Sequence, residues 1–440
     1  MTDSVLRRTS PLGAPRGQLP GRTAQVRLGQ LEVMLGVVAV LAVAVTLVAG
    51  TIGAAIFLVA TVALIGVRPA ASARDLARFA PLLALPLLAM VSTIWSDAPE
   101  RTLRAGIQLM VTIMAAIIVC RRVPSTTLIA VLLAATLAMC LGSLAKLPAA
   151  LSSGHPLVGL FGSKNELALV AHLQFALDLA IIFDRRQHPL LRIGALLAVP
   201  LAVLLVILAQ SAGVKTSLIV TLLTFPAFLL IGRVSPALRI VIIVLTAVAL
   251  ALALVFMSDI LAAWTDYQVN VLKKDTTLTG RTYLWDFAAR LVAERPLLGH
   301  GYYAFWRVGN VDAEGLWRWG GIASRSGFNF HNELVEMKVD LGWVGAIVFL
   351  VTSAGIAAAT LLRQFTKGDV IIAALMSLLT VLYIRSLAES SLIGPFNIMT
   401  FLWIGAAVYA RTESKPLRDK SSIPQTHQGR AARQFPARVP

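Results

Sequence analysis

Apolar runs of about 17 to 25 residues follow one another along this chain from Val33 onward. An α-helix needs a run of this length to cross the hydrocarbon core of a bilayer. The sequence therefore predicts an all-α, polytopic integral membrane protein. We expect about twelve transmembrane helices, at residues 33–49, 51–67, 77–95, 103–120, 126–145, 166–183, 189–209, 215–232, 237–257, 333–362, 369–387 and 393–410.

The composition agrees with a membrane protein and disfavours several kinds of site. The mean hydropathy is +0.79, and 14% of the residues are charged, whereas soluble domains average about 25%. Cys120 and Cys140 both lie in apolar runs, so neither a disulfide framework nor a cysteine metal site is expected. Five of the six histidines are dispersed, with no pair at metal-ligand spacing, namely His155, His172, His188, His300 and His427. We therefore expect no metal and no other cofactor.

The net charge of +17 is explained by membrane topology. If the N-terminal tail is cytoplasmic, 24 of the 39 Lys and Arg residues fall on the cytoplasmic side, as the positive-inside rule requires. Both termini are then cytoplasmic. The basic residues are accounted for by membrane lipids and topology, and a nucleic-acid partner is poorly supported.

This topology divides the chain into five segments. We expect a disordered basic cytoplasmic tail at residues 1–31, nine transmembrane helices within 32–257 and a long loop at 258–332. Three more transmembrane helices follow within 333–410, and a disordered cytoplasmic tail at 411–440. The loop between helices 9 and 10 is the longest polar interval, so a reacting group is expected there.

Several polar clusters fall on the same outer face as this loop. A single cation near a helix end can simply extend to the membrane interface. Three cations beside one histidine favour a functional interpretation, and these are Lys215, Arg281 and Arg385.

Within the loop, Leu284, Phe287, Ala288 and Leu291 recur at helical spacing, from a start at Thr279 or Gly280 to a stop at Pro296. The pattern predicts an amphipathic helix on the membrane surface. Arg281 then lies in the first turn, where the helix dipole favours an anion. A cation is unfavourable at this position, and a phosphate bound beside Arg281 would offset the repulsion from the dipole. The alternative is an exposed arginine that contacts Asp286 or water.

His331 lies just before the tenth membrane helix, or in its first turn, with Asn329 or Asn332 as the cap. A neutral imidazole there can act as a general base. Five of the eight tryptophans lie in the loop, either as interfacial aromatics or as platforms for sugar rings. Within the sixth membrane helix, His172, Gln174 and Asp178 are expected to bond neighbouring helices first, and to line a substrate or ion path only second.

Taken in order, these motifs resemble a known family. Gly280-Arg281-Thr282 with Trp285, Pro296 with Gly299 and Gly301, and His331-Asn332 before Leu341-Gly342-Trp343 are similar to the O-antigen ligase and Wzy-type polymerase superfamily. Its exopolysaccharide-production branch is resembled by three further stretches: Trp95-Ser96 to Arg104, Phe161-Gly162-Ser163-Lys164-Asn165, and Arg385 with Glu389-Ser390.

The resemblance implies a metal-independent, inverting glycosyltransferase on the periplasmic side of a bacterial inner membrane, with an undecaprenyl-diphosphate-linked saccharide donor. It makes His331 the catalytic base. Donor diphosphate binding is expected from Arg281 and Lys215, with Arg385 and Lys164 able to contribute; Lys215 stands where the ligases usually carry arginine, and lysine lacks the bidentate fork. Site support is expected from Asn165, Asn332, Glu389 and Trp285.

The acceptor decides between two enzymes of this superfamily. A polymerase of exopolysaccharide or O-antigen uses a second lipid-linked repeat, and a ligase uses lipid A core; we favour the polymerase, with a chain-length regulator as a possible partner. A lipid-linked oligosaccharide transporter or flippase would instead place charges along the membrane depth and often shows paired halves. A non-catalytic scaffold of an export complex would tolerate loss of His331.

Overall fold

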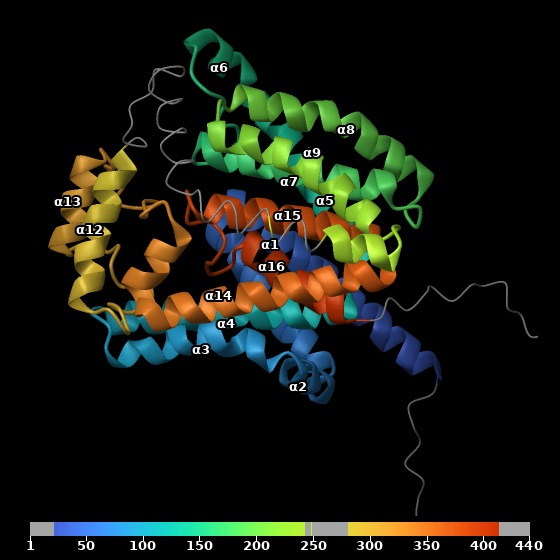
Figure 1. Ribbon diagram of the computed structural model, residues 1–440, viewed down its shortest axis with the longest axis horizontal. Coiled ribbons are helices and arrows are strands. Elements are labelled where there is room, and N and C mark those ends of the chain that lie inside the picture. Colours follow the sequence, from blue (N-terminus) through green and yellow to red (C-terminus); the bar gives the residue numbers. More distant parts are fainter. Residues whose placement is uncertain (1–21, 243–247, 249–279, 413–440) are drawn as a thin grey trace, which may run out of the picture.

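The computed structural model describes residues 22–242, 248 and 280–412, and these residues form helices without any β-strand (Figure 1). The first half contains α1 (Arg22–Val67), α2 (Pro69–Arg78), α3 (Ala84–Val91), α4 (Pro99–Arg122), α5 (Ser125–Ser143), α6 (Leu147–Ser153), α7 (Lys164–Phe183), α8 (Pro189–Leu208) and α9 (Ala212–Ile231). The second half contains α12 (Arg281–Glu294), α13 (Val311–Trp319), α14 (Glu333–Lys367), α15 (Val370–Ser386) and α16 (Ile398–Arg411).

Seven of the described helices are long and apolar enough to cross a membrane, or eight if the pair Pro69–Arg78 and Ala80–Ile94, bent by 85°, forms one span. The expected number of twelve is therefore not confirmed. The predicted spans 33–49 and 51–67 are the two arms of α1, which meet at Gly50 as predicted, and most of 237–257 lies outside the described residues. The last two predicted spans correspond to α15 and α16, which are shorter apolar helices of 17 and 14 residues.

The α1 element contains a sharp reversal at Gly50, whose φ of 47° is not helical. A Cβ on Gly53 would lie 2.9 Å from the backbone nitrogen of Thr46. Residues seven apart in a straight helix are about 10.5 Å apart along the axis, so the two arms of α1 fold back on each other. A glycine suits this bend because it adopts positive φ without steric cost.

The bundle is organised around α16, which is buried along its length from Ile398 to Ala410. A helix that is apolar on all sides belongs in the centre of a large protein. The main hydrophobic core joins α16 to buried side chains of α1, α4, α5, α7 and α15. In Figure 1, α12 and α13 lie across one end of this bundle, next to the first turns of α14.

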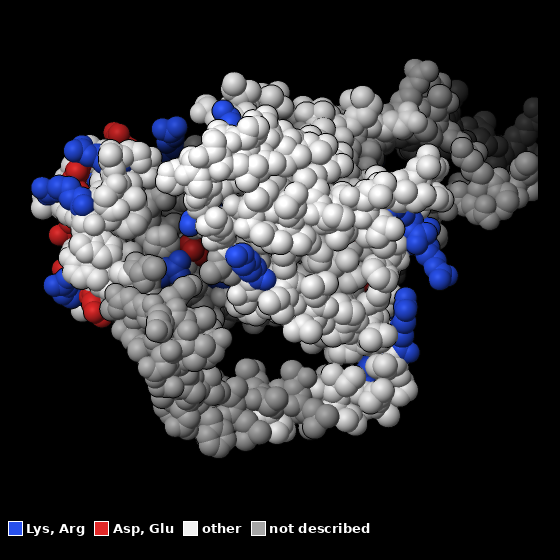
Figure 2. All heavy atoms as spheres, turned by 90° about the horizontal axis from the view of Figure 1, so that it is seen from above, with Lys and Arg blue, Asp and Glu red and all other residues white. Residues whose placement is uncertain are grey.

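Charged side chains gather at the two ends of the bundle, and Figure 2 shows a broad band of other residues between them. At the end far from α12, Arg122 pairs with Asp75 and Glu32, and Arg186 pairs with Asp369, with 2.9 Å between Nη1 and Oδ2. The acidic side chains at this end are therefore neutralised by arginines. Arg122 and Arg186 are among the residues that the sequence analysis expected in cytoplasmic connections.

The helix expected in the long loop is α12, and it begins directly after Gly280 and ends before Pro296, as predicted. Its buried residues are Leu284, Ala288 and Leu291, which pack with Phe305, Leu316 and Val339. The apolar face is therefore covered by protein, from α13 and the start of α14. That α12 also lies on the membrane surface remains a prediction.

The segment from Pro296 to Gly301 docks into a break in α14 at Gly342, whose φ is 65°. The amide nitrogens of Trp343 and Val344 donate to the carbonyls of Pro296 and Leu297, at 2.8 and 3.2 Å. These bonds replace the helical partners that are lost at the break. A Cβ on Gly342 would lie 2.2 Å from the Leu297 carbonyl, so the close approach requires glycine.

Candidate active site

His331 lies two residues before the first residue of α14, Glu333, in a strained backbone position. Asn332 is the N-cap of α14, and its Oδ1 accepts hydrogen bonds from the amides of Leu334 and Val335, at 3.0 and 3.2 Å. Of the two caps that the sequence allowed, Asn332 is the one used. His331 has φ of +51°, and its amide donates to Asn329 Oδ1 at 2.8 Å. A strained backbone conformation persists only where the surrounding structure holds it, and such residues cluster at functional sites.

Glu389, in the connection after α15, joins His331 to Arg281. Its Oε2 lies 3.0 Å from His331 Nδ1, and its Oε1 accepts a hydrogen bond from Arg281 Nη2 at 2.7 Å. Arg281 therefore pairs with Glu389 and not with Asp286, the partner considered from sequence. One carboxylate thus connects the predicted base to the first turn of α12.

The pair with Glu389 decides which imidazole nitrogen is available for chemistry. An ionised carboxylate can only accept, so His331 Nδ1 must donate to it. The other nitrogen, Nε2, then carries the lone pair of the neutral ring. Burial raises the pKa of the Glu389 carboxyl, but the hydrogen bond from His331 and the charges of His331, Arg281 and Arg385 outweigh it, so this pKa lies below its usual range.

Arg385 lies at the end of α15, beside the same carboxylate. It is 9% exposed, and its Nε has no hydrogen-bond partner among the described residues. A Cβ on Gly213 would lie 3.9 Å from Arg385 Nη1, which places the start of α9 next to this guanidinium. Two arginines and one carboxylate leave an excess of positive charge, and a buried cation without a full set of partners favours an anionic ligand.

A cavity of about 590 Å³ opens beside these groups. His331 and Arg281 line it together with Asn165, Gly280, Leu284, Trp319, Gly320 and Phe328. Its volume is in the range of small-molecule sites, about 300–1,000 Å³. The edge of the His331 ring packs on Phe328, with 5.7 Å between the ring centroids.

The structure places the remaining predicted residues at different distances from this cavity. Trp285 donates from Nε1 to the Phe330 carbonyl at 2.8 Å, directly before His331. Asn165 lines the cavity, whereas Lys164 and Lys215 are exposed and are not among its lining residues. Both lysines lie in the first turns of helices, α7 and α9. Their role in donor binding remains a prediction.

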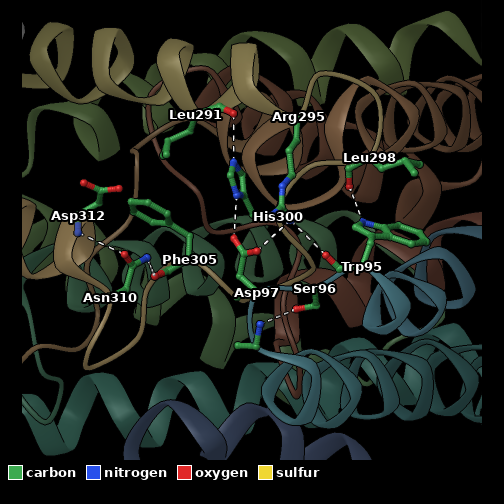
Figure 3. A network of polar contacts seen from close by, with 12 residues as sticks. Trp95, Ser96, Asp97, Leu291, Arg295, Leu298, His300, Phe305, Asn310 and Asp312 are labelled. Atoms are coloured by element: carbon green, nitrogen blue, oxygen red, sulfur yellow. Dashed lines mark hydrogen bonds and ion pairs between the residues drawn. The ribbon is translucent and has the colours of Figure 1, made fainter.

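A second polar network fixes α12 to the outer end of the bundle (Figure 3). His300 Nδ1 lies 2.9 Å from Asp97 Oδ2, and His300 Nε2 lies 3.1 Å from the Leu291 carbonyl. Arg295 pairs with the same aspartate, at 2.9 Å from Nη1 to Oδ1. Sequence reasoning considered His300 only as a metal ligand and missed this network. The signal available was a histidine between two glycines, Gly299 and Gly301, where the backbone must come close to a neighbour.

Hydrogen bonds between helices involve two of the three buried polar residues of α7, His172 and Gln174, as expected first, whereas Asp178 is bonded within α7. His172 Nε2 lies 2.8 Å from Thr221 Oγ1 in α9. Gln174 accepts a hydrogen bond from Thr136 in α5 and donates to Asp178 at 2.8 Å. Such bonds join packed helices where water is absent.

The apolar helices of the bundle define a multi-pass membrane protein, and a histidine, a carboxylate and two arginines gather at one end of it. A family model described as O-antigen ligase matches residues 196–350. The chain is also 31% identical over 330 residues to the exopolysaccharide production protein ExoQ of Rhizobium meliloti (strain 1021), which covers 73% of this chain and 74% of that protein. The chain belongs to the O-antigen ligase and Wzy-type polymerase superfamily, and is a glycan-processing membrane enzyme.

Proposed function

We propose that this protein is an inverting glycosyltransferase that polymerises undecaprenyl-diphosphate-linked saccharide repeats into exopolysaccharide or O-antigen. The observation that carries the proposal is the bridge that Glu389 forms between His331 and Arg281 at the edge of the 590 Å³ cavity. It combines a base and an anion-binding cation in one connected group. The similarity to an exopolysaccharide production protein supports polymer synthesis.

His331 would act as the general base. Its Nε2 takes the proton from an acceptor hydroxyl while that oxygen attacks the anomeric carbon of the donor. The new bond joins the acceptor oxygen to the anomeric carbon, and the bond from that carbon to the diphosphate oxygen breaks on the opposite face. Glu389 holds the ring in the required tautomer and stabilises the imidazolium that forms, as carboxylates do for other catalytic histidines.

The leaving diphosphate needs positive charge, and no general acid. Arg281 and the partly unpaired Arg385 are the cations nearest to Glu389, and Lys215 and Lys164 are proposed to extend this surface. Fixed cations aimed at developing charge are among the largest contributions to catalysis. We assign charge stabilisation to these cations.

We propose that the site faces the periplasm and that both termini are cytoplasmic, in the bacterial inner membrane. The basic residues at the opposite end of the bundle support this orientation, because α14 runs from Glu333 beside the site to Lys367 at that end, and positively charged connections favour the cytoplasm. The undecaprenyl tail would then lie among the membrane helices.

Complementation of a deletion strain tests the function. Wild type, His331→Ala and Arg281→Ala are expressed at matched membrane abundance, and surface and lipid-linked polysaccharide are analysed. We expect both variants to accumulate single lipid-linked repeats that face the periplasm. Accumulation of finished chains on the lipid would identify a ligase, which is the activity that the description of the matching family model names. Normal polymer from His331→Ala would favour a transporter or scaffold.

A further inference from the structure

A second cavity, of about 370 Å³, adjoins the segment that carries His331, because Phe328 and Asn329 line it. Phe328 lines both cavities. Asn329 and Ser390 also line the second one, and these two residues accept hydrogen bonds from the amides of His331 and Asn332, at 2.8 and 3.1 Å. The second cavity therefore adjoins the residues that position the predicted base.

Three carboxylates of α14 line this second cavity: Glu333, Glu336 and Asp340. Residues three and four apart lie on one face of a helix, so the three groups face the same space. Arg101 and Arg325 are the only cations in its wall among the described residues, and Arg325 is paired with Glu314. Backbone amides and Trp306 Nε1 already donate to these three carboxyl groups, and their remaining lone pairs could accept from the hydroxyl groups of an uncharged sugar.

Aromatic side chains form another part of the wall, namely Tyr303, Trp306 and Trp317. Trp317 is 2% exposed, and its Nε1 has no hydrogen-bond partner among the described residues. Buried indole N–H groups usually find an acceptor. A buried donor without an acceptor, on a side chain that lines a cavity, is a second, independent sign of a ligand that carries acceptor oxygens.

The backbone around this cavity is strained. Five described residues other than glycine have positive φ, and two of them line the second cavity, Tyr303 at 61° and Arg325 at 50°. The Tyr303 backbone is held by Asp340, which accepts from its amide at 3.0 Å, and by Arg101, which donates to its carbonyl at 2.8 Å. The aromatic ring is thus fixed at the cavity by two charged partners.

We propose that the second cavity binds the acceptor saccharide, through a sugar ring without negative charge that packs on the aromatic side chains and donates hydroxyl hydrogens to the carboxylates. This inference rests on the proposed function, since it places the acceptor on one side of His331 and the lipid diphosphate on the other. Trp317 Nε1 donates to an oxygen of the bound sugar.

Binding is measured by titration calorimetry on the full-length protein in lipid nanodiscs. The probe is the repeat saccharide released by mild acid from the lipid-linked material that a deletion strain accumulates, so it lacks lipid and diphosphate. We expect Trp317→Phe to weaken binding by about 3- to 10-fold, the loss of one hydrogen bond. Its thermal stability should not fall by a comparable amount, because the free protein gives this N–H no partner. Tyr303→Ala should weaken binding by about 10-fold.

Two controls accompany these variants. Trp343→Phe makes the same change at a tryptophan that is 49% exposed and does not line the cavity, and it should bind like wild type. Arg281→Ala lies in the first cavity and should also keep the saccharide affinity. Wild type that does not bind the saccharide, or Trp317→Phe and Tyr303→Ala that bind it normally, would overturn the proposal.

Transfer assays separate this proposal from the proposed function. If polymer synthesis requires His331 but the second-cavity variants neither bind more weakly nor need more acceptor for half-maximal rate, only the acceptor site is wrong. If the saccharide binds and the variants weaken it while wild type forms no polymer from lipid-linked repeats, the cavity stands as a saccharide site and the polymerase assignment fails.

Discussion

The negative charge of the Glu389 carboxylate is expected to contribute more to the catalytic rate than the size of its side chain. Glu389→Gln keeps the side-chain length but replaces a charged acceptor of two hydrogen bonds, at 3.0 Å from His331 Nδ1 and 2.7 Å from Arg281 Nη2. A hydrogen bond to a charged group contributes about 1.5–3 kcal/mol. If one such bond is lost mainly in the transition state, where the imidazolium forms, the rate falls by about 10- to 150-fold, at 1.36 kcal/mol per factor of ten.

The assay is polymer formation from lipid-linked repeats by membranes that contain equal amounts of each protein. Glu294→Gln makes the same change on the exposed side of α12 and should retain the wild-type rate. A Glu389→Gln enzyme with the wild-type rate, or a loss equal to that of Glu294→Gln, would refute the role of the carboxylate as the partner of His331.

Three further predictions follow from the same contacts. Gly342→Ala should destabilise the protein by about 1–3 kcal/mol or more, because it places a side chain at positive φ and against the Leu297 carbonyl, whereas Gly355→Ala, with no atom within 4 Å of its new Cβ, should be neutral; thermal unfolding of the two purified variants compares them. Because the folded-state pKa of Glu389 is lowered, its contribution to stability is present above its unfolded pKa and is lost as the pH falls through the folded value, so the difference in melting temperature between wild type and Glu389→Gln should disappear only under acidic conditions. Polymer formation in membranes washed with EDTA should continue at the untreated rate, and a loss restored by Mg²⁺ would contradict the assignment of charge stabilisation to the arginines.

Local features of the fold could be predicted from the sequence because their causes are local. The bounds of α12 follow from Gly280 and Pro296, and its buried face follows from helical spacing. The apolar runs locate most of the bundle helices. The reversal at Gly50 separates the predicted spans 33–49 and 51–67. The number of spans is harder to predict, since the two central helices α15 and α16 are short.

The pairings within the site could not be read from the sequence in the same way. Glu389 was expected only to support the site, and its contact with His331 joins residues 58 positions apart. Asp286 was considered as a partner of Arg281 because it is near in the sequence, whereas the fold brings the distant Glu389 to 2.7 Å from Arg281 Nη2. The break in α14 depends on the arrival of Pro296 and Leu297 from the preceding loop, and hydropathy along α14 does not reveal it.

The break in α14 at Gly342 also fixes the distance along the helix axis from the break to His331. Residues Glu333 to Leu341 form a short helical post between the break and the cap at Asn332, and nine residues at 1.5 Å each rise about 13 Å. The carbonyls of Val339 and Asp340 in this stretch accept from the amides of His300 and Gly301, at 2.9 and 2.8 Å, and the amides of Trp343 and Val344 beyond the break donate to Pro296 and Leu297. Because the segment from Pro296 to Gly301 is thus bonded to both sides of the break, His331 is held at a constant level relative to the rest of α14. A substrate anchored by a lipid tail would meet the base at this level at every cycle, however long the glycan beyond it has grown.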